Sequence, residues 1–157
     1  MTNTLAVELN YLQMTNGARD MALGLITDED LRYALPGNPA LGEVFREMGE
    51  VQQAYLASFK HSKLDWSYKH ADPDVATSKD KLVAWFKHLD DDMNATLTAS
   101  SEADLDEKKI ERGADFNPTL REQMAIYGDA VYIFVGKVSV YLRALGKATD
   151  QWQSYFG

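Results

Sequence analysis

The amino-acid sequence predicts an all-helical protein. Apolar residues recur at intervals of three and four along four long segments, which is the period of one face of an α-helix. We find no segment with the alternation of apolar and polar residues that is typical of a half-buried strand. Proline, glycine and N-capping residues fall between the four segments, where helices start and stop. Together these observations predict a four-helix bundle.

The first predicted helix runs from about residue 4 to residue 26. The polar run 27–30 ends it and caps a short turn through residues 31–35. Pro36-Gly37-Asn38-Pro39 then breaks the chain. We expect the apolar stripe of this helix to face the core; its members are Val7, Tyr11, Met14, Ala18, Met21 and Leu25.

The second and third predicted helices carry clear apolar stripes. The second spans about 39–61, with Pro39 in the first turn, where a missing N–H costs nothing. The third begins after Ser78, whose side chain can cap it. The stripes are Leu41, Val44, Phe45, Met48, Val51, Tyr55 and Phe59 in the second helix, and Leu82, Trp85, Phe86, Leu89, Met93 and Leu97 in the third.

The fourth predicted helix has the most regular pattern. We expect it to start at Asn117-Pro118, an N-cap followed by a first-turn proline, and to end at Gly146. The tail 147–157 should fold back over the bundle, and exposed Trp152 and Phe156 could equally serve a dimer interface. Two interleaved seven-residue series form an a/d seam: Leu120, Tyr127, Phe134 and Tyr141, with Met124, Val131, Val138 and Leu145.

Two long connections separate the predicted helices. Residues 62–77 are polar and aromatic and could carry helical turns of their own. Residues 98–116 are acidic, then mixed in charge, and are expected to form a solvated loop. Connections of this length predict a bundle with at least one crossover. At 157 residues, without a repeat or a second core, the chain is expected to form a single domain over residues 1–157.

Composition narrows the classes of partner. The net charge of −8 argues against binding to nucleic-acid phosphates and to anionic membranes. The chain has no cysteine, which excludes disulfides, thiolate metal sites and a cysteine nucleophile. Its start lacks a basic region followed by an apolar run, and no stretch approaches 18 uninterrupted apolar residues. We therefore expect a cytoplasmic protein that binds neither nucleic acid nor membrane.

The segment 136–146, GKVSVYLRALG, resembles the end of the last helix in the DinB-like superfamily, also called the DinB/YfiT-like metalloenzyme fold. That family pattern reads approximately His-x3-His-Arg-Gly-Gln, then hydrophobic residues, then Leu-Arg-x-x-Gly. Residues 35–44 are similar to the family's turn into helix 2, and residues 81–86 are in keeping with helix 3. The resemblance spans nearly the whole chain. It implies an up-down-down-up bundle, often a homodimer, that binds zinc or nickel through three histidines; relatives include thiol transferases and thiol-dependent isomerases.

The chain departs from this family at the metal ligands. Aligning Gly136 and Lys137 on the family's Gly-Gln places Ala130 and Phe134 where two histidines stand, and the turn into helix 2 places Glu47 at the third. A methyl group and a phenyl ring cannot donate to a metal, and one carboxylate cannot make a zinc site. We expect no metal and no cofactor at this degenerate metal site. Phe134 lies on the apolar seam and is expected to fill the space by packing.

Other side chains could carry chemistry in the same cleft. Glu47 and Glu50, with Asp129, could form a carboxylate cluster whose pKa values are split for acid–base work. Tyr127 could add a hydroxyl to a mainly apolar cleft. The alternative is that the carboxylates are solvated and that the tyrosine is part of the core.

The histidines and the aspartate run are weaker candidates. His61, His70 and His88 do not share the spacing of a ligand set on one helix, so we expect surface or capping roles. The consecutive residues 90–92 are all aspartate. Consecutive helix positions point in different directions, so these three carboxylates are not expected to chelate one ion.

Three function classes remain open. The first is a metal-free module that binds a small apolar ligand or a partner, expected as a homodimer. The second is a transferase or hydrolase that acts in the same central cleft through Glu47, Glu50 or Tyr127, of the thiol-transferase type if a metal is bound. The third is a structural or regulatory protein. A carboxylate and a tyrosine converging in an open cleft would favour the enzyme, whereas a cleft plugged by Phe134 would favour binding or a scaffold role.

Overall fold

The computed structural model describes residues 4–157, and this part of the chain is helical without a β-strand, as predicted. Short segments pair only through isolated bridges. The long helices are α1 (Thr4–Gly24), α2 (Leu41–His61), α3 (Lys79–Thr98) and α5 (Leu120–Ala144). The short ones are η1 (Asp30–Arg32), η2 (Pro73–Thr77), α4 (Asp104–Glu107) and α6 (Asp150–Phe156).

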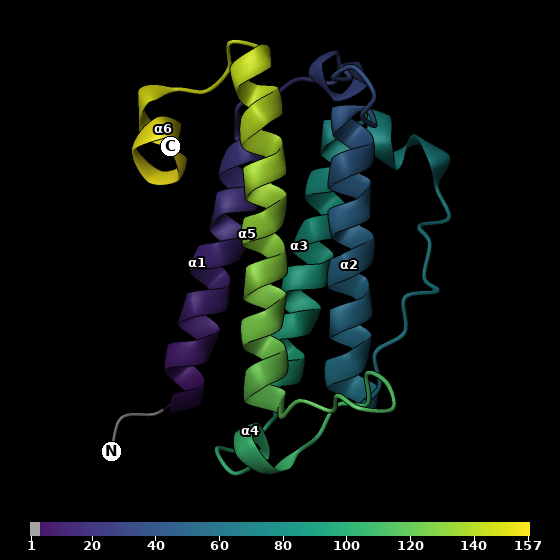
Figure 1. The fold of residues 1–157 in the computed structure, drawn as a ribbon, viewed down its shortest axis with the longest axis vertical. Helices are drawn as coiled ribbons and strands as arrows, with labels where there is room; N and C mark the ends of the chain where they lie inside the picture. Colours follow the sequence, from purple (N-terminus) through teal and green to yellow (C-terminus); the bar gives the residue numbers. More distant parts are fainter. Residues whose placement is uncertain (1–3) are drawn as a thin grey trace.

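The four long helices lie side by side and enclose a common apolar core (Figure 1). Helix α2 packs against α3 and α5, and α1 packs against the same two helices. The start of α2 also contacts η1 and η2, and α6 packs against α5. Each long helix therefore buries side chains against two long neighbours.

Contacts at the helix ends show how these helices run relative to one another. The Leu5 N–H donates to the Glu102 carboxylate at 2.9 Å, so the start of α1 lies beside the end of α3. The Tyr141 hydroxyl donates to the Pro39 carbonyl at 2.6 Å, so the end of α5 lies beside the start of α2. Each of these pairs is antiparallel. Figure 1 shows the connection from residue 62 to residue 78 running back along the molecule, so that α3 starts at the same end as α2.

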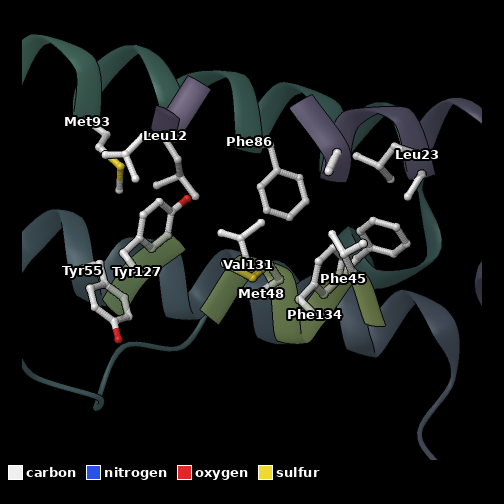
Figure 2. Close-up of a cluster of buried hydrophobic side chains, with 14 of the residues drawn as sticks. Leu12, Leu23, Phe45, Met48, Tyr55, Phe86, Met93, Tyr127, Val131 and Phe134 are labelled. Atoms are coloured by element: carbon white, nitrogen blue, oxygen red, sulfur yellow. The ribbon is translucent and has the colours of Figure 1, made fainter. Parts of the chain in front are cut away.

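The predicted stripes of the second, third and fourth helices are confirmed with few exceptions. Only Val51, Trp85 and Leu145 of those residues are half-buried rather than buried. Figure 2 shows how the buried side chains from the four helices meet. Phe45 of α2 packs edge-on against Phe134 of α5, with ring centroids 5.1 Å apart.

The predicted stripe of the first helix is wrong in its first half, Val7, Tyr11 and Met14, whereas Ala18 is buried and Met21 and Leu25 are half-buried. Val7 and Met14 are 54% and 68% exposed, and Tyr11 is exposed as well. The prediction failed because the buried face carries polar residues at its centre, which break the apolar period. That face consists of Leu5, Leu12, Thr15, Asn16, Ala18, Arg19, Ala22 and Leu23.

Two helix starts differ from their predictions. Helix α2 begins at Leu41, so Pro39 lies before it. Helix α5 begins at Leu120 and not near residue 117, because residues 117–119 pair with 108–110, as in the hydrogen bond from the Ile110 N–H to the Pro118 carbonyl at 2.9 Å. Its cap is Thr119, which exchanges hydrogen bonds with Glu122 in a capping box.

Two other predicted helix boundaries are confirmed by the structure. The Ser78 hydroxyl accepts a hydrogen bond from the Lys81 N–H at the start of α3. Gly146 follows α5 with a φ of +68°, the left-handed conformation that ends many helices. At the other end of the chain, α1 stops at Gly24, two residues earlier than expected.

Parts of the second connection and of the tail are buried, and the tail packs against α5 through α6, as predicted. Leu105 and Ile110 are fully buried, and Lys108 Nζ donates to the Phe59 carbonyl at 2.9 Å. The expectation of a solvated loop is therefore wrong for Leu105 and Ile110, whereas the charged residues between them are exposed or half-buried. In the tail, Trp152 is buried and its indole N–H donates to Ser139 Oγ at 3.0 Å, which corrects the expectation that it is exposed.

Helix α5 is long and apolar enough, by length and composition alone, to cross a membrane, and no other helix within residues 4–157 meets that test. Half of its most apolar window is buried against the rest of the protein. The central helix of a globular core has the same character, so this is weak evidence for a span.

Candidate functional site

A groove between α2 and α5 brings three of the predicted site residues together. Glu47 from α2 and Ala130 and Phe134 from α5 line one hollow of about 160 Å³. Ala130 and Phe134 are four positions apart on a helix and therefore share a face. The other lining residues are mostly apolar: Val44, Met48, Val51, Ile133 and Lys137.

Phe134 occupies the inner wall of the α2–α5 groove. Its ring is buried and packs against Phe45, and Figure 2 shows the two rings side by side in the core. A histidine at this position would present a ring nitrogen, whereas the phenyl ring presents only carbon. The Ala130 methyl group also presents only carbon, so neither position supplies a metal ligand.

The rim of the α2–α5 groove carries one exposed ion pair. Lys137 Nζ lies 3.5 Å from Glu47 Oε2, and both side chains are mostly in solvent. Such a pair contributes little to stability. A second hollow, of about 460 Å³, shares Val44, Glu47 and Lys137 with the first and extends to Pro39 and Tyr141. The groove is thus continuous along α2 and α5.

Glu50 lies outside this groove. Its buried carboxylate accepts hydrogen bonds from Lys69 Nζ at 2.7 Å and from the His70 N–H at 3.2 Å. These bonds attach the connection between α2 and α3 to α2. Asp129 is exposed on α5 near Tyr11. The three carboxylates do not gather, and within residues 4–157 no cluster of three or more acidic or histidine side chains is placed to hold a metal ion.

Tyr127 also turns away from the α2–α5 groove. Its buried hydroxyl donates to Asn16 Oδ1 on α1 at 2.7 Å, and Figure 2 shows the hydroxyl directed toward Leu12 of the same helix. Burial raises the pKa of the Tyr127 phenol well above its ordinary value. The hydroxyl is therefore a neutral hydrogen-bond donor in the core and is not paired with Glu47.

Arg19 is the centre of a buried polar network that the sequence analysis missed. Its guanidinium donates to Asp90 Oδ2 at 2.6 Å, to Gln52 Oε1 at 2.7 Å and to Asp20 Oδ1 at 2.6 Å. It also lies 4.2 Å from the centroid of the Phe86 ring. Although burial disfavours the charge, the hydrogen bonds and charges of the two aspartates raise the pKa of Arg19.

The same network links all four long helices. Asp90 Oδ1 on α3 accepts from Gln52 Nε2 on α2 at 2.6 Å and from Asn16 Nδ2 on α1 at 2.9 Å. Asn16 in turn accepts from Tyr127 on α5. The sequence does contain a signal for this network. Asn16 and Arg19 continue the helical spacing of Leu5, Leu12 and Leu23, which indicates that the two polar side chains lie on the buried face of the first helix.

The aspartates at 90–92 diverge, as their consecutive positions predict. Asp90 joins the buried network, Asp91 pairs with Lys87 at 2.7 Å, and Asp92 pairs with Lys60 at 2.6 Å. Their carboxylates therefore face three different surroundings.

The histidines lie in separate places. His61 is the last residue of α2, and His88 is exposed on α3. His70, in the connection before α3, packs against Trp85 with the rings tilted and their centroids 4.2 Å apart.

A second cavity, of about 120 Å³, lies between α1 and α3 next to the Arg19 network. Leu9, Leu12, Met93 and Leu97 form its apolar walls. Its polar lining consists of Gln13, Asn16, Asp20, Asp90 and Asn94.

Comparison of the chain with protein-family models, with curated proteins and with solved structures finds no match. The resemblance of residues 35–44 and 136–146 to the DinB-like superfamily therefore stays a prediction.

Proposed function

We propose that this chain is a metal-free, DinB-like four-helix bundle of up-down-down-up topology that binds a small apolar ligand in the α2–α5 groove. One observation carries the proposal. Glu47, Ala130 and Phe134, the positions that the resemblance equates with metal ligands, come from distant parts of the sequence and line one groove. Two of these side chains offer no donor atom to a metal.

The directions of the helices support the proposed topology. Helix α1 is antiparallel to α3, and α2 is antiparallel to α5, as the contacts at their ends require. Helices α2 and α3 start at the same end of the molecule, and the connection of residues 62–78 runs back along the molecule to join the end of α2 to the start of α3 (Figure 1). A chain of this kind needs a long crossover between its second and third long helices.

The composition of the α2–α5 groove supports an apolar ligand. Most of the residues that line it are apolar, Val44, Met48 and Ile133 among them, and the Glu47–Lys137 pair lies at its rim. Apolar surface removed from water by a ligand contributes about 25 cal/mol per Å². The alternative, a transferase or hydrolase, needs a carboxylate and a tyrosine together, and the Tyr127 hydroxyl instead bonds to Asn16.

We further propose a cytoplasmic homodimer. Exposed apolar side chains on the neighbouring helices α1 and α5 support the dimer, because adjacent exposed apolar side chains can form a patch that a second copy covers. The net charge of −8 supports the absence of nucleic-acid and membrane partners. These side chains are Val7, Tyr11 and Met14 of α1 and Tyr132 of α5.

A three-histidine variant tests the proposed family register. The triple substitution Glu47→His, Ala130→His and Phe134→His should bind about one zinc or nickel ion per chain and unfold at a higher temperature with metal than without it. The native chain should bind neither metal saturably. A control with histidines at Glu43, Ala125 and Ala144, which do not line the groove, should behave like the native chain.

Two results would overturn this part of the proposal. One is a folded triple variant, judged by circular dichroism, that binds no more metal than the control. The other is stoichiometric metal in the native chain by elemental analysis, which would make a metal-dependent transferase the leading hypothesis.

Blocking the groove tests ligand binding. Octanol should shift the NMR methyl signals of Val44 and Met48 saturably, and Ala130→Trp should abolish these shifts by filling the groove. Ala125→Trp, on an exposed part of the same helix, should leave them unchanged. Equal binding by both variants would rule out the groove as the ligand site.

A further inference from the structure

The cavity between α1 and α3 is separate from the α2–α5 groove and has a different chemistry. Leu9 and Leu12 of α1 face Met93 and Leu97 of α3 across about 120 Å³. A dry cavity of roughly 150 Å³ holds a molecule the size of benzene. The space therefore suits a ligand with a short apolar body.

Two carboxylates at the polar end of this cavity share a single cation. Arg19 pairs with Asp20 and with Asp90, each at 2.6 Å, which leaves one net negative charge. The Arg19 side chain is 1% exposed, whereas those of Asp20 and Asp90 are 56% and 28% exposed. The guanidinium is thus buried behind the carboxylates, and a ligand in the cavity meets the carboxylates first.

The mouth of the cavity adds two side-chain amides. Gln13 Nε2 on α1 donates to Asn94 Oδ1 on α3 at 3.4 Å, and this bond is exposed. A long, exposed hydrogen bond opens at little cost, because water replaces it. One carboxylate, that of Asp90, is enough to neutralise the charge of Arg19. The second carboxylate, that of Asp20, therefore gives this end of the cavity a net negative charge.

We propose that this cavity binds a small primary ammonium ion with a short apolar body. The ammonium group offers three donors and a positive charge to the carboxylates of Asp20 and Asp90, and the apolar body lies against Leu9, Leu12 and Met93. A carboxylate of the same size meets like charge at this end. An alcohol of the same size lacks the charge.

Three probes of equal size test the charge preference. We expect n-butylammonium to shift the NMR signals of Met93, Asn94 and the Leu12 methyl groups saturably in the full-length chain. Butanol should bind about tenfold more weakly because it lacks the charge, and butyrate should not bind because it meets like charge; water around the partly exposed carboxylates screens both effects. Equal affinity for the three probes, or no saturable shift with n-butylammonium, would overturn the proposal.

Substitutions test the position of the site. Asp20→Asn should weaken n-butylammonium binding about tenfold, because it removes the excess negative charge beside Arg19. Asp115→Asn changes the net charge equally on an exposed carboxylate that does not line the cavity, so it should bind like the native chain. Equal weakening in both variants would show a general charge effect and no site.

Filling the cavity gives a test that does not depend on the carboxylates. Leu9→Phe should abolish n-butylammonium binding, and retained binding in this variant would also overturn the proposal. Ala130→Trp, which blocks the α2–α5 groove, should leave amine binding intact. The two proposed sites therefore succeed or fail separately.

Discussion

The polar side chains of the Arg19 network depend on partners from other helices. Arg19, Gln52 and Asp90 come from three helices, and each satisfies the others. Within residues 4–157, no buried side-chain nitrogen or oxygen lacks a hydrogen-bond partner. Removing one member should therefore cost more than the hydrogen bonds it makes, because the remaining partners stay desolvated.

Arg19→Met tests this dependence. Without the guanidinium, the partly exposed Asp90 carboxylate keeps only neutral donors from the protein, so we expect the free energy of unfolding to fall by about 1–3 kcal/mol. Urea unfolding followed by circular dichroism measures the loss. Arg143→Met, at an exposed position of α5, serves as control and should change stability by less than about 0.5 kcal/mol. Similar losses in both variants would show that the network does not stabilise the fold.

At the scale of elements, the start of α2 lies unusually close to η2. A Cβ atom at Gly42 would collide with the backbone carbonyl of Ala76 and would crowd that of Leu31. Backbone atoms cannot move aside as the end of a flexible side chain can. Glycine at this position therefore sets how closely α2 approaches the turn that leads into α3.

Two glycine substitutions of opposite expected sign test this contact. Gly42→Ala should reduce the free energy of unfolding by about 1–3 kcal/mol, because the two elements have to separate. Gly136→Ala, in open space on α5, should increase it by about 0.5–1 kcal/mol, since alanine favours the helix. Thermal and urea unfolding measure both. Stabilisation by Gly42→Ala would contradict the close approach.

At the scale of the whole molecule, an ion pair joins the start of η1 to the segment after α5. Asp30 Oδ2 lies 3.0 Å from Lys147 Nζ and accepts hydrogen bonds from Thr27. Burial opposes ionisation of Asp30, but Lys147 and the Thr27 donors outweigh it and hold its pKa below the usual 3.8. The folded state therefore favours the charged form.

This pair predicts a loss of stability in acid. A carboxylate whose pKa is lower in the folded state stabilises the protein above its unfolded pKa, and that contribution disappears as the pH falls through the folded value. We expect the urea midpoint to fall as the pH drops below about 4. Asp30→Asn should lower the midpoint at neutral pH and reduce its change in acid. An unchanged acid dependence in this variant would assign the effect to other carboxylates.

The sequence by itself determined the helical class, the buried faces of α2, α3 and α5, and the lack of donor atoms at Ala130 and Phe134. Apolar periodicity and side-chain chemistry are local properties, so they can be read before the fold is known. The sequence also contains the capping box of Thr119 and Glu122, but Asn117-Pro118 is an equally good start signal and predicts that α5 begins earlier than it does.

Only the tertiary structure decided which face of α1 is buried, where Glu50 and Tyr127 point, and that Trp152 is covered. Burying a polar side chain is tolerable only when another element supplies its hydrogen bonds, and those partners are distant in sequence. The two cavities depend on tertiary structure for the same reason. Asp20 and Asp90, or Glu47 and Ala130, line one space because two helices pack together, and no spacing along either helix specifies that packing.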